Sequence, residues 1–220
     1  MPSSTVEDYI KRLYTEQKKT PGELVPMGRL AEVMAVVPGT VTTMIKALSD
    51  SGLVEYEPRA GVRLTPQGER LALHVLRRHR LVELFLVRTL GLDWSEVHAE
   101  AETLEHAISE KVLERIDALL GFPDCDPHGS PIPTADGEVA PEHTFSLASA
   151  VEGQRYRIDR VCDAESEFLQ FAERAGLVPG AHVRILRADL PADAVTVDVE
   201  GRGTSTMGLG AARRIFLSPV

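Results

Sequence analysis

The chain has 220 residues, of which 43% are hydrophobic and 26% are charged, and its formal net charge at pH 7 is −9. This length predicts two or three domains that each bury a core, and it excludes a disulfide-stapled miniprotein. No segment approaches the roughly 18 consecutive apolar residues of a membrane-spanning helix, and the first residues lack the pattern of a secretory signal. Cys125 and Cys162 form no motif. We therefore expect a cytoplasmic protein with reduced thiols and no membrane contact.

Charge is distributed unevenly along the chain. Residues 1–80 hold 12 Lys plus Arg against 9 Asp plus Glu, a balance of +3, whereas residues 81–220 hold 12 against 24, a balance of −12. Because phosphate contacts require local positive charge, the first third is the part suited to face DNA. The acidic remainder could recruit divalent cations, although an acidic surface often serves only solubility.

Three helices and a hairpin are predicted before residue 66. Ser4-Thr5-Val6-Glu7 has the form of a capping box and predicts a helix over about 5–18. Apolar residues at helical spacing predict a second helix over 27–34 and a third that begins near Pro38 and ends before Ser51-Gly52. Alternating residues on both sides of a Pro-Arg-Ala-Gly turn predict a hairpin. Three helices followed by a hairpin are typical of a winged helix-turn-helix.

The rest of the chain predicts a helical part and a β part. A long helix is expected over 66–89, and two more over 95–105 and from Ile108 to Gly121. Residues 121–143 are rich in Pro, Gly and Asp and predict an irregular tether. Short alternating segments then predict strands at 156–158, 182–186, 195–199 and 214–217, with one helix near 165–175. These strands suggest a small β-barrel.

Polar side chains gather at the start of the third predicted helix, where a recognition helix reaches base edges. Threonine hydroxyls and methyls can contact phosphates or thymine, lysine can pair with a phosphate, and wing arginines can reach the neighbouring groove. The alternative is a solvated polar face on a protein-interaction module. The candidate DNA contacts are Pro38, Thr40, Thr42, Thr43 and Lys46 in the helix, and Arg59 and Arg63 in the wing.

A histidine and carboxylate cluster follows in the helical part. His98, Glu102, Glu105 and His106 fall within an arc of about 100° on one helix face. On the preceding helix, His79 and Glu83 share a face at i and i+4. Clustered carboxylates repel one another unless a cation compensates them, so we expect a metal site rather than the alternative, a solvated charged face. Oxygen and nitrogen donors without sulfur favour Mn²⁺ or Fe²⁺ over copper or structural zinc.

Two other classes of function compete with a regulator. Residues 102–106 look like an inverted zincin motif whose first His has become Glu, but no H-E-x-x-H occurs. A metal-dependent hydrolase would also need an open coordination position beside a substrate cleft, so we expect no enzyme. A metal buffer without DNA binding is the third class, and metal-dependent retention of operator DNA distinguishes it from a regulator.

Five segments resemble the diphtheria toxin repressor family of iron- and manganese-dependent transcriptional regulators. They are residues 27–66, 78–83, the Gly91-Leu92-Asp93 turn, 97–106 and 126–133. The resemblance is strong over residues 4–135, and the part after about Leu147 resembles the SH3-like domain of the longer members. It implies a winged helix over 1–73, a helical metal-binding and dimerisation domain with a Pro-rich tether over 74–140, and an SH3-like, FeoA-type domain over 147–220.

The resemblance also implies a function and two metal sites. The expected protein is a homodimer that, when loaded with metal, binds palindromic operator DNA and represses metal-uptake genes. The principal site maps onto Asp8, Glu102, Glu105 and His106. Iron-sensing members usually carry Met and Cys at the positions of Asp8 and Glu102, so manganese is favoured. The second site maps onto His79, Glu83 and His98, with Asp163, Glu165 and Glu167 as candidates to complete it.

The sequence departs from the short manganese regulators at one position. Lys11 stands where short manganese regulators place a Glu, so their closely spaced two-metal cluster beside the aspartate is not predicted. An ion that joins Asp8 to the distant cluster would tie two domains together and select the angle between them at which DNA binds. Dimerisation is predicted from an excess of apolar helix surface, namely Leu81, Leu84, Phe85, Leu92, Val112, Ile116 and Leu119.

Overall fold

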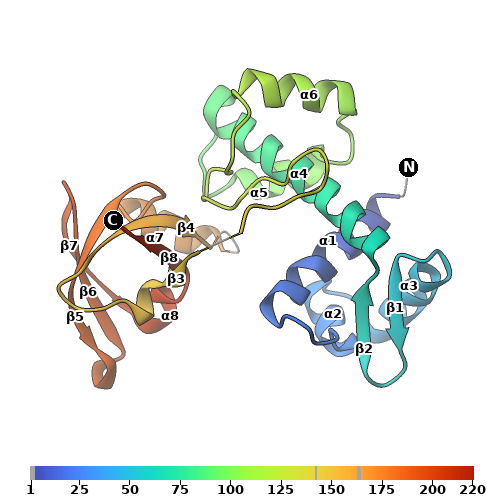
Figure 1. Cartoon of the computed structure of the whole chain (residues 1–220), viewed down its shortest axis with the longest axis horizontal. Coiled ribbons are helices and arrows are strands. Elements are labelled where there is room, and N and C mark those ends of the chain that lie inside the picture. Colours follow the sequence, from blue (N-terminus) through green and yellow to red (C-terminus); the bar gives the residue numbers. More distant parts are fainter. Residues whose placement is uncertain (1–2, 142, 163–164) are drawn as a thin grey trace. The chain divides into compact units, whose positions relative to one another are not determined.

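The computed structural model describes residues 3–141, 143–162 and 165–220. Its internal contacts divide the chain into two units, Met1–Arg78 with Pro133–Glu138, and His79–Ile132 with Val139–Val220. Helix α4 (Pro66–Leu90) is continuous and contributes to both units (Figure 1).

The first unit is a winged helix-turn-helix, as predicted. It contains α1 (Ser4–Lys19), α2 (Met27–Val33), α3 (Pro38–Asp50), and the antiparallel strands β1 (Val54–Glu57) and β2 (Gly61–Leu64). Helices α2 and α3 meet at 108°, within the range of helix-turn-helix pairs. The capping box predicted at Ser4 is wrong by one residue, because the N-cap is Ser3, whose side chain accepts from the Val6 N–H.

The core of the first unit comes from the apolar stripes of its helices. Ile10 and Leu13 of α1, Leu30 of α2, and Ile45 and Leu48 of α3 are almost fully buried. Burying each such side chain contributes about 1.5–3 kcal/mol.

Side-chain contacts tie the other elements of this unit to α1. The Gln17 side-chain oxygen accepts from the Leu64 N–H at 2.9 Å, which attaches the wing to α1. A buried ion pair of 2.8 Å between Glu7 and Arg78 attaches α1 to α4. These two contacts join the wing and α4 to α1.

The second unit begins with three helices. The C-terminal half of α4 packs with α5 (Val97–Leu104) and α6 (Glu110–Leu119). Leu81, Leu84 and Ile116 are buried within the chain, so their assignment to a dimer surface is wrong. They pack on each other because they lie on the inward faces of α4 and α6. Val112 and Leu119, on the outer face of α6, are 49% and 66% exposed and stay candidates for that surface.

The proline-rich segment after α6 is packed rather than a free tether. Among its described residues none lies in a helix or strand, yet Asp126, His128 and Ile132 are buried. Gly129 has φ of +87°, and a Cβ there would clash with the Asp159 carbonyl oxygen, so glycine allows the close approach to strand β4 (Arg155–Val161). The Val161 N–H donates to the His128 carbonyl at 2.9 Å. The segment thus delivers His128 to the interior.

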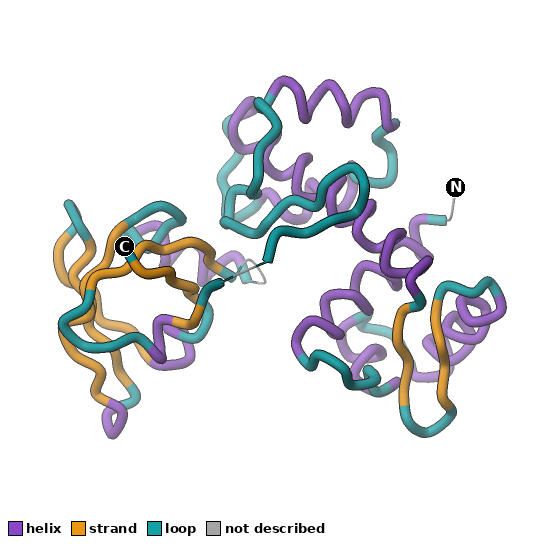
Figure 2. The backbone as a smooth tube through the Cα atoms, in the orientation of Figure 1, coloured by secondary structure: helices purple, strands orange, loops and turns teal. Residues whose placement is uncertain are grey.

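The C-terminal part is a six-stranded antiparallel sheet with strand order β3-β8-β4-β5-β6-β7. Figure 2 shows these strands in orange, with short helices between them. The predicted strands are confirmed as β4, β5, β6 and β8, and the predicted helix is confirmed as α7. Strands β3 and β7 were not predicted. Strand β3 is only two residues long, and β7 is rich in Gly, Ser and Thr, which give no alternating apolar pattern. The bounds are β3 (Phe145–Ser146), α7 (Ser166–Arg174), β5 (His182–Asp189), β6 (Ala194–Val199), β7 (Gly203–Gly208), α8 (Leu209–Ala212) and β8 (Ile215–Pro219).

Among the described residues, no single helix is long and apolar enough to cross a membrane. One helix pair, α2 with α3, passes the combined test of length and composition, but it is the bent helix-turn-helix pair.

Candidate metal centre

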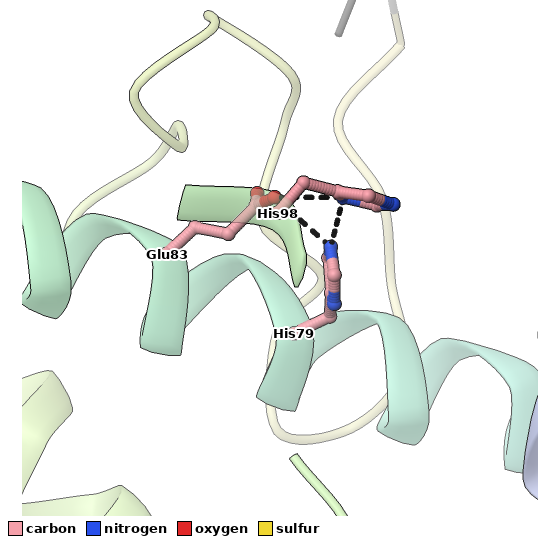
Figure 3. A group of neighbouring side chains, drawn as sticks. All are labelled: His79, Glu83 and His98. Atoms are coloured by element: carbon pink, nitrogen blue, oxygen red, sulfur yellow. Dashed lines mark hydrogen bonds and ion pairs between the residues drawn. The ribbon is translucent and has the colours of Figure 1, made fainter. Parts of the chain in front are cut away.

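Three side chains converge between α4 and α5. His79 and Glu83 are one turn apart on α4, and His98 lies in the first turn of α5 (Figure 3). The His79 Nε2 atom is 3.0 Å from Glu83 Oε1 and 3.0 Å from His98 Nδ1, and the His98 Nδ1 atom is 3.1 Å from the same Glu83 oxygen. The three ligand atoms form a nearly equilateral triangle, as the i and i+4 spacing on α4 predicts for His79 and Glu83.

The tautomer of His79 is set by a fourth residue. Its Nδ1 atom is 2.6 Å from the Glu105 carboxylate, and both side chains are buried. Because an ionised carboxylate only accepts hydrogen bonds, Nδ1 carries a proton, and the neutral ring presents its Nε2 lone pair toward Glu83 and His98. A carboxylate behind the ring of a metal-binding histidine is a common arrangement that orients the ring and raises its basicity.

The cluster holds Glu83 in its ionised form. Burial raises the pKa of this carboxyl, but the charge and hydrogen bond of His79, the hydrogen bond of His98 and the charge of His128 outweigh burial and hold the pKa well below its usual range. A fully buried carboxylate surrounded by imidazole nitrogens is a site of concentrated negative charge.

The donor set fits a divalent cation. Ligand atoms about 2.1 Å from an ion and at right angles to one another lie about 3 Å apart, which is the spacing of the triangle. Carboxylate oxygen and imidazole nitrogen are ligands for manganese, iron and zinc. His79, Glu83 and His98 would hold the ion as Lewis bases.

A second group of ligand-type side chains, Glu83, Asp126 and His128, was missed in the sequence. All three are buried, and their ligand atoms lie within 4.8 Å of one another. Asp126-Pro127-His128 lies in the segment that we predicted to be a tether. The pairing of Asp and His two residues apart is too common to indicate a site by itself, and the resemblance of residues 126–133 to the family implied no metal ligand there.

The remaining metal candidates are placed as follows. Glu102 lies on α5 with its carboxylate 3.4 Å from His98 Nε2, and His106 Nε2 is 3.5 Å from the buried Glu105 carboxylate. Asp8 is half-buried on α1, in the first unit. The structure brings Glu105 and His106 together and connects Glu105 to His79, while Glu102 contacts His98.

The structure does not place the described C-terminal candidates at the second site. Asp163 lies outside the described residues. Glu165 pairs with Arg214 at 3.0 Å and Glu167 is exposed on the first turn of α7. Within the described residues, neither Glu165 nor Glu167 is grouped with the histidine cluster.

The candidate DNA contacts lie on the surface of the first unit. Pro38, Thr40, Thr43 and Lys46 are exposed on α3, and Thr42 is half-buried. The hydroxyls of Thr42 and Thr43 donate to the carbonyls of Pro38 and Gly39, so toward DNA they offer their methyl groups and an accepting oxygen.

The two wing arginines differ from each other. Arg59 is exposed at the wing tip with φ of 71°. Arg63 pairs with Glu55 on the facing strand at 2.6 Å, so a phosphate would have to compete with that carboxylate.

The fold and the ligand cluster together define a class: DNA-binding regulators that combine a winged helix with a metal-binding helical domain. Comparison with known proteins agrees. Family models of the iron-dependent repressor match residues 1–62 (N-terminal DNA binding domain) and 65–134 (metal binding and dimerisation domain), and a FeoA domain model matches residues 145–219.

Individual relatives are similar over most of their length. An uncharacterized HTH-type transcriptional regulator of Methanocaldococcus jannaschii is 39% identical over 54% of this chain and 94% of its own length. The iron-dependent repressor IdeR of Mycobacterium tuberculosis is 29% identical over 92% of both chains. A solved manganese-dependent transcriptional repressor in complex with manganese is 37% identical, with a TM-score of 0.90, over 98% of this chain and 100% of that one.

This chain belongs to the iron- and manganese-dependent transcriptional repressor family. The predicted architecture is confirmed: an N-terminal DNA-binding helix-turn-helix domain, a helical dimerisation domain and a C-terminal FeoA-type, SH3-like domain. The family consists of DNA-binding repressors and not of enzymes, so the hydrolase alternative is not supported.

Proposed function

We propose that this protein is a manganese-responsive repressor that acts in the cytoplasm as a homodimer on palindromic operator DNA and controls metal-uptake genes. The observation that carries the proposal is the triangle of His79, Glu83 and His98, in which His79 and Glu83 are buried and the three ligand atoms lie about 3 Å apart, as they would around one cation. We keep the division into domains over 1–73, 74–140 and 147–220 as part of this proposal.

The principal site of the proposal joins Asp8 to Glu102, Glu105 and His106. Asp8 stands on a helix of the DNA-binding unit, whereas the other three stand on or just after α5 in the second unit. An ion shared by all four would restrict the angle between the units. It would favour the angle at which two recognition helices are about one DNA turn apart in a dimer.

Manganese is preferred over iron because the four principal ligands are oxygens and one imidazole nitrogen. Sulfur donors favour softer metals, and this set has none. The manganese-dependent repressor cited above is similar over its full length, which supports the same preference.

The DNA interface proposed for this repressor consists of Pro38, Thr40, Thr42, Thr43 and Lys46 on α3, with Arg59 and Arg63 from the wing. Support comes from their surface position on a helix-turn-helix whose first 80 residues carry a balance of +3. In a dimer each face would be presented twice, which fits a two-fold symmetric operator.

The test is DNA binding to the chain's own promoter region, titrated separately with Mn²⁺, Fe²⁺ and Zn²⁺ for the unmodified protein and for Asp8→Ala. We expect Mn²⁺ to induce DNA binding, and we expect Asp8→Ala to need at least tenfold more Mn²⁺ than the unmodified protein. Unchanged metal dependence in Asp8→Ala would remove the shared-ion mechanism. Asp50→Ala, an exposed aspartate at the end of α3, is the matched control for loss of a carboxylate.

A further inference from the structure

The two oxygens of the Glu83 carboxylate face different histidines. Oε1 lies 3.0 Å from His79 Nε2 and 3.1 Å from His98 Nδ1. Oε2 faces His128, whose Nδ1 atom is 3.9 Å away. The Glu83 side chain is fully buried, so both oxygens need partners within the protein or a bound ion.

The tautomer of His128 leaves a lone pair directed at Glu83. Its Nε2 atom is 2.8 Å from the Trp94 carbonyl, which can only accept, so Nε2 carries a proton, and in the neutral ring Nδ1 carries the lone pair. Within the described residues, the buried His128 Nδ1 and Glu83 Oε2 atoms have no hydrogen-bond partner. Two acceptors thus face each other in the interior at a distance too long for a hydrogen bond.

Asp126 completes this second group. Its Oδ1 atom lies 4.0 Å from His128 Nδ1 and accepts from the backbone N–H groups of His128 and Ser130. The other oxygen, Oδ2, lies 3.6 Å from Arg80 Nε. Arg80 compensates the charge of Asp126 at Oδ2. It does not lie between Glu83 and His128, where a second positive charge could bind.

We propose that Glu83 bridges two divalent ions: one held through Oε1 with His79 and His98, and one held through Oε2 with Asp126 and His128. The proposal rests on the proposed function for the first of these ions and adds the second. A carboxylate that offers one oxygen to each of two ions is how proteins place ions about 3.5–4 Å apart. This pair is distinct from the two-metal cluster beside Asp8, which Lys11 argues against.

The donors indicate the class of ion. Each half of the pair offers imidazole nitrogen and carboxylate oxygen without sulfur, the donor set of manganese, iron or zinc. Two dications opposite two buried carboxylates would also compensate the repulsion between Glu83 and Asp126.

Metal stoichiometry tests the bridge, with Mn²⁺ alone as the probe and mass spectrometry of the intact folded protein as the readout. With the principal site included, we expect three ions per chain in the unmodified protein, two in His98→Ala, two in His128→Ala and one in Glu83→Ala. His74→Ala, an exposed histidine on the same helix, should retain three. Full occupancy in His128→Ala, or loss of one and the same ion in both single variants, would overturn the proposal.

Two further readouts guard against a variant that fails to fold. Asp126→Asn keeps the size of the side chain and should weaken binding of the second ion at least tenfold. Trp94, the single tryptophan of the chain, stacks on His128 with ring centroids 5.3 Å apart. Paramagnetic Mn²⁺ at His128 should therefore quench the fluorescence of Trp94 in the unmodified protein and in His98→Ala. The quenching should be much weaker in Asp126→Asn. Equal quenching in all three would contradict a second ion at His128.

Electron paramagnetic resonance distinguishes a bridged pair from two separate ions. Two Mn²⁺ ions that share a carboxylate give an exchange-coupled spectrum, which His98→Ala and His128→Ala should both abolish; a spectrum of isolated ions only would overturn the bridge. The DNA titration of Asp8→Ala tests the proposed function, and its outcome does not depend on whether the two ions are bridged. If DNA binding ignores Mn²⁺ while the coupled pair is present, the proposed function is wrong and the bridge stands.

Discussion

Two sets of polar side chains in this protein obey opposite physical rules. On α3, the candidate DNA contacts are exposed or half-buried, and water satisfies them until a nucleic acid replaces it. Between α4 and α5, Glu83 and Glu105 are fully buried, as is His128 nearby, and each polar atom must find its partner inside. The comparison teaches that a recognition surface can be left open to its partner, whereas a buried cluster of acceptors implies a cation that belongs to the fold.

The largest effect should come from the apolar frame behind the buried cluster. Leu84 is 2% exposed in the core between α4 and α6, so Leu84→Ala should cost about 2–5 kcal/mol of unfolding free energy. Chemical denaturation monitored by circular dichroism measures this loss. Leu119→Ala, on the exposed face of α6, should change the free energy by less than about 0.5 kcal/mol in the monomer. Equal costs for the two variants would contradict the core described here.

Bound metal should raise the unfolding free energy through the buried cluster, and substitutions on α3 should not change this gain. At a free Mn²⁺ concentration about 100 times the dissociation constant, each ion should add about 2.7 kcal/mol to the unfolding free energy. Thermal unfolding with and without chelator measures the gain, which Glu83→Ala should reduce and Thr43→Ala should leave intact. If Glu83→Ala keeps the full gain, the ions lie elsewhere.

On the exposed side of the comparison, Lys46→Ala should weaken DNA binding without changing metal affinity. Loss of one phosphate contact per chain should lower the slope of log affinity against log salt by about 0.9 per chain. Fluorescence anisotropy at several salt concentrations gives this slope. Lys18→Ala removes an exposed lysine from α1 of the same unit and should leave the slope unchanged. Equal slopes for Lys46→Ala and the unmodified protein would remove Lys46 from the interface.

The smallest effect concerns Glu16, which connects α1 to α2. Burial raises the pKa of this carboxyl, but ion pairs with Arg29 at 2.7 Å and Lys19 at 2.5 Å lower it overall. A depressed folded-state pKa gives stability that is present above the ordinary Glu pKa and is lost as pH falls through the folded value. Glu16→Gln should therefore cost about 1 kcal/mol at pH 7 and almost nothing at strongly acidic pH, as measured by urea unfolding. A cost independent of pH would contradict the ion-pair explanation.

Much of the fold could be predicted because its signals are local. The helices follow from apolar spacing, the hairpin from alternation around Pro58-Arg59-Ala60-Gly61, and the pairing of His79 with Glu83 from the i and i+4 geometry of one helix. The resemblance to a known family then placed His98 with them, and the structure brings these three together.

The rest depends on contacts between distant segments. Residues 126–132 look like a tether because of their prolines, but contacts with distant segments, among them the packing of Gly129 on Asp159, make them an interior loop that brings His128 to Glu83. Likewise, the hydrogen bond from His79 to Glu105 joins two residues that are 26 positions apart in sequence. Spacing within one helix contains no information on such pairs.

The most direct test of metal control is the affinity of the protein for Mn²⁺ with and without its promoter DNA. If the ion and DNA favour the same arrangement, each must strengthen binding of the other by one and the same factor, which we expect to be at least tenfold, or about 1.4 kcal/mol. Calorimetric titration of Mn²⁺ into the protein alone and into the protein–DNA complex gives that factor. An Mn²⁺ affinity that DNA leaves unchanged would contradict metal control of this repressor.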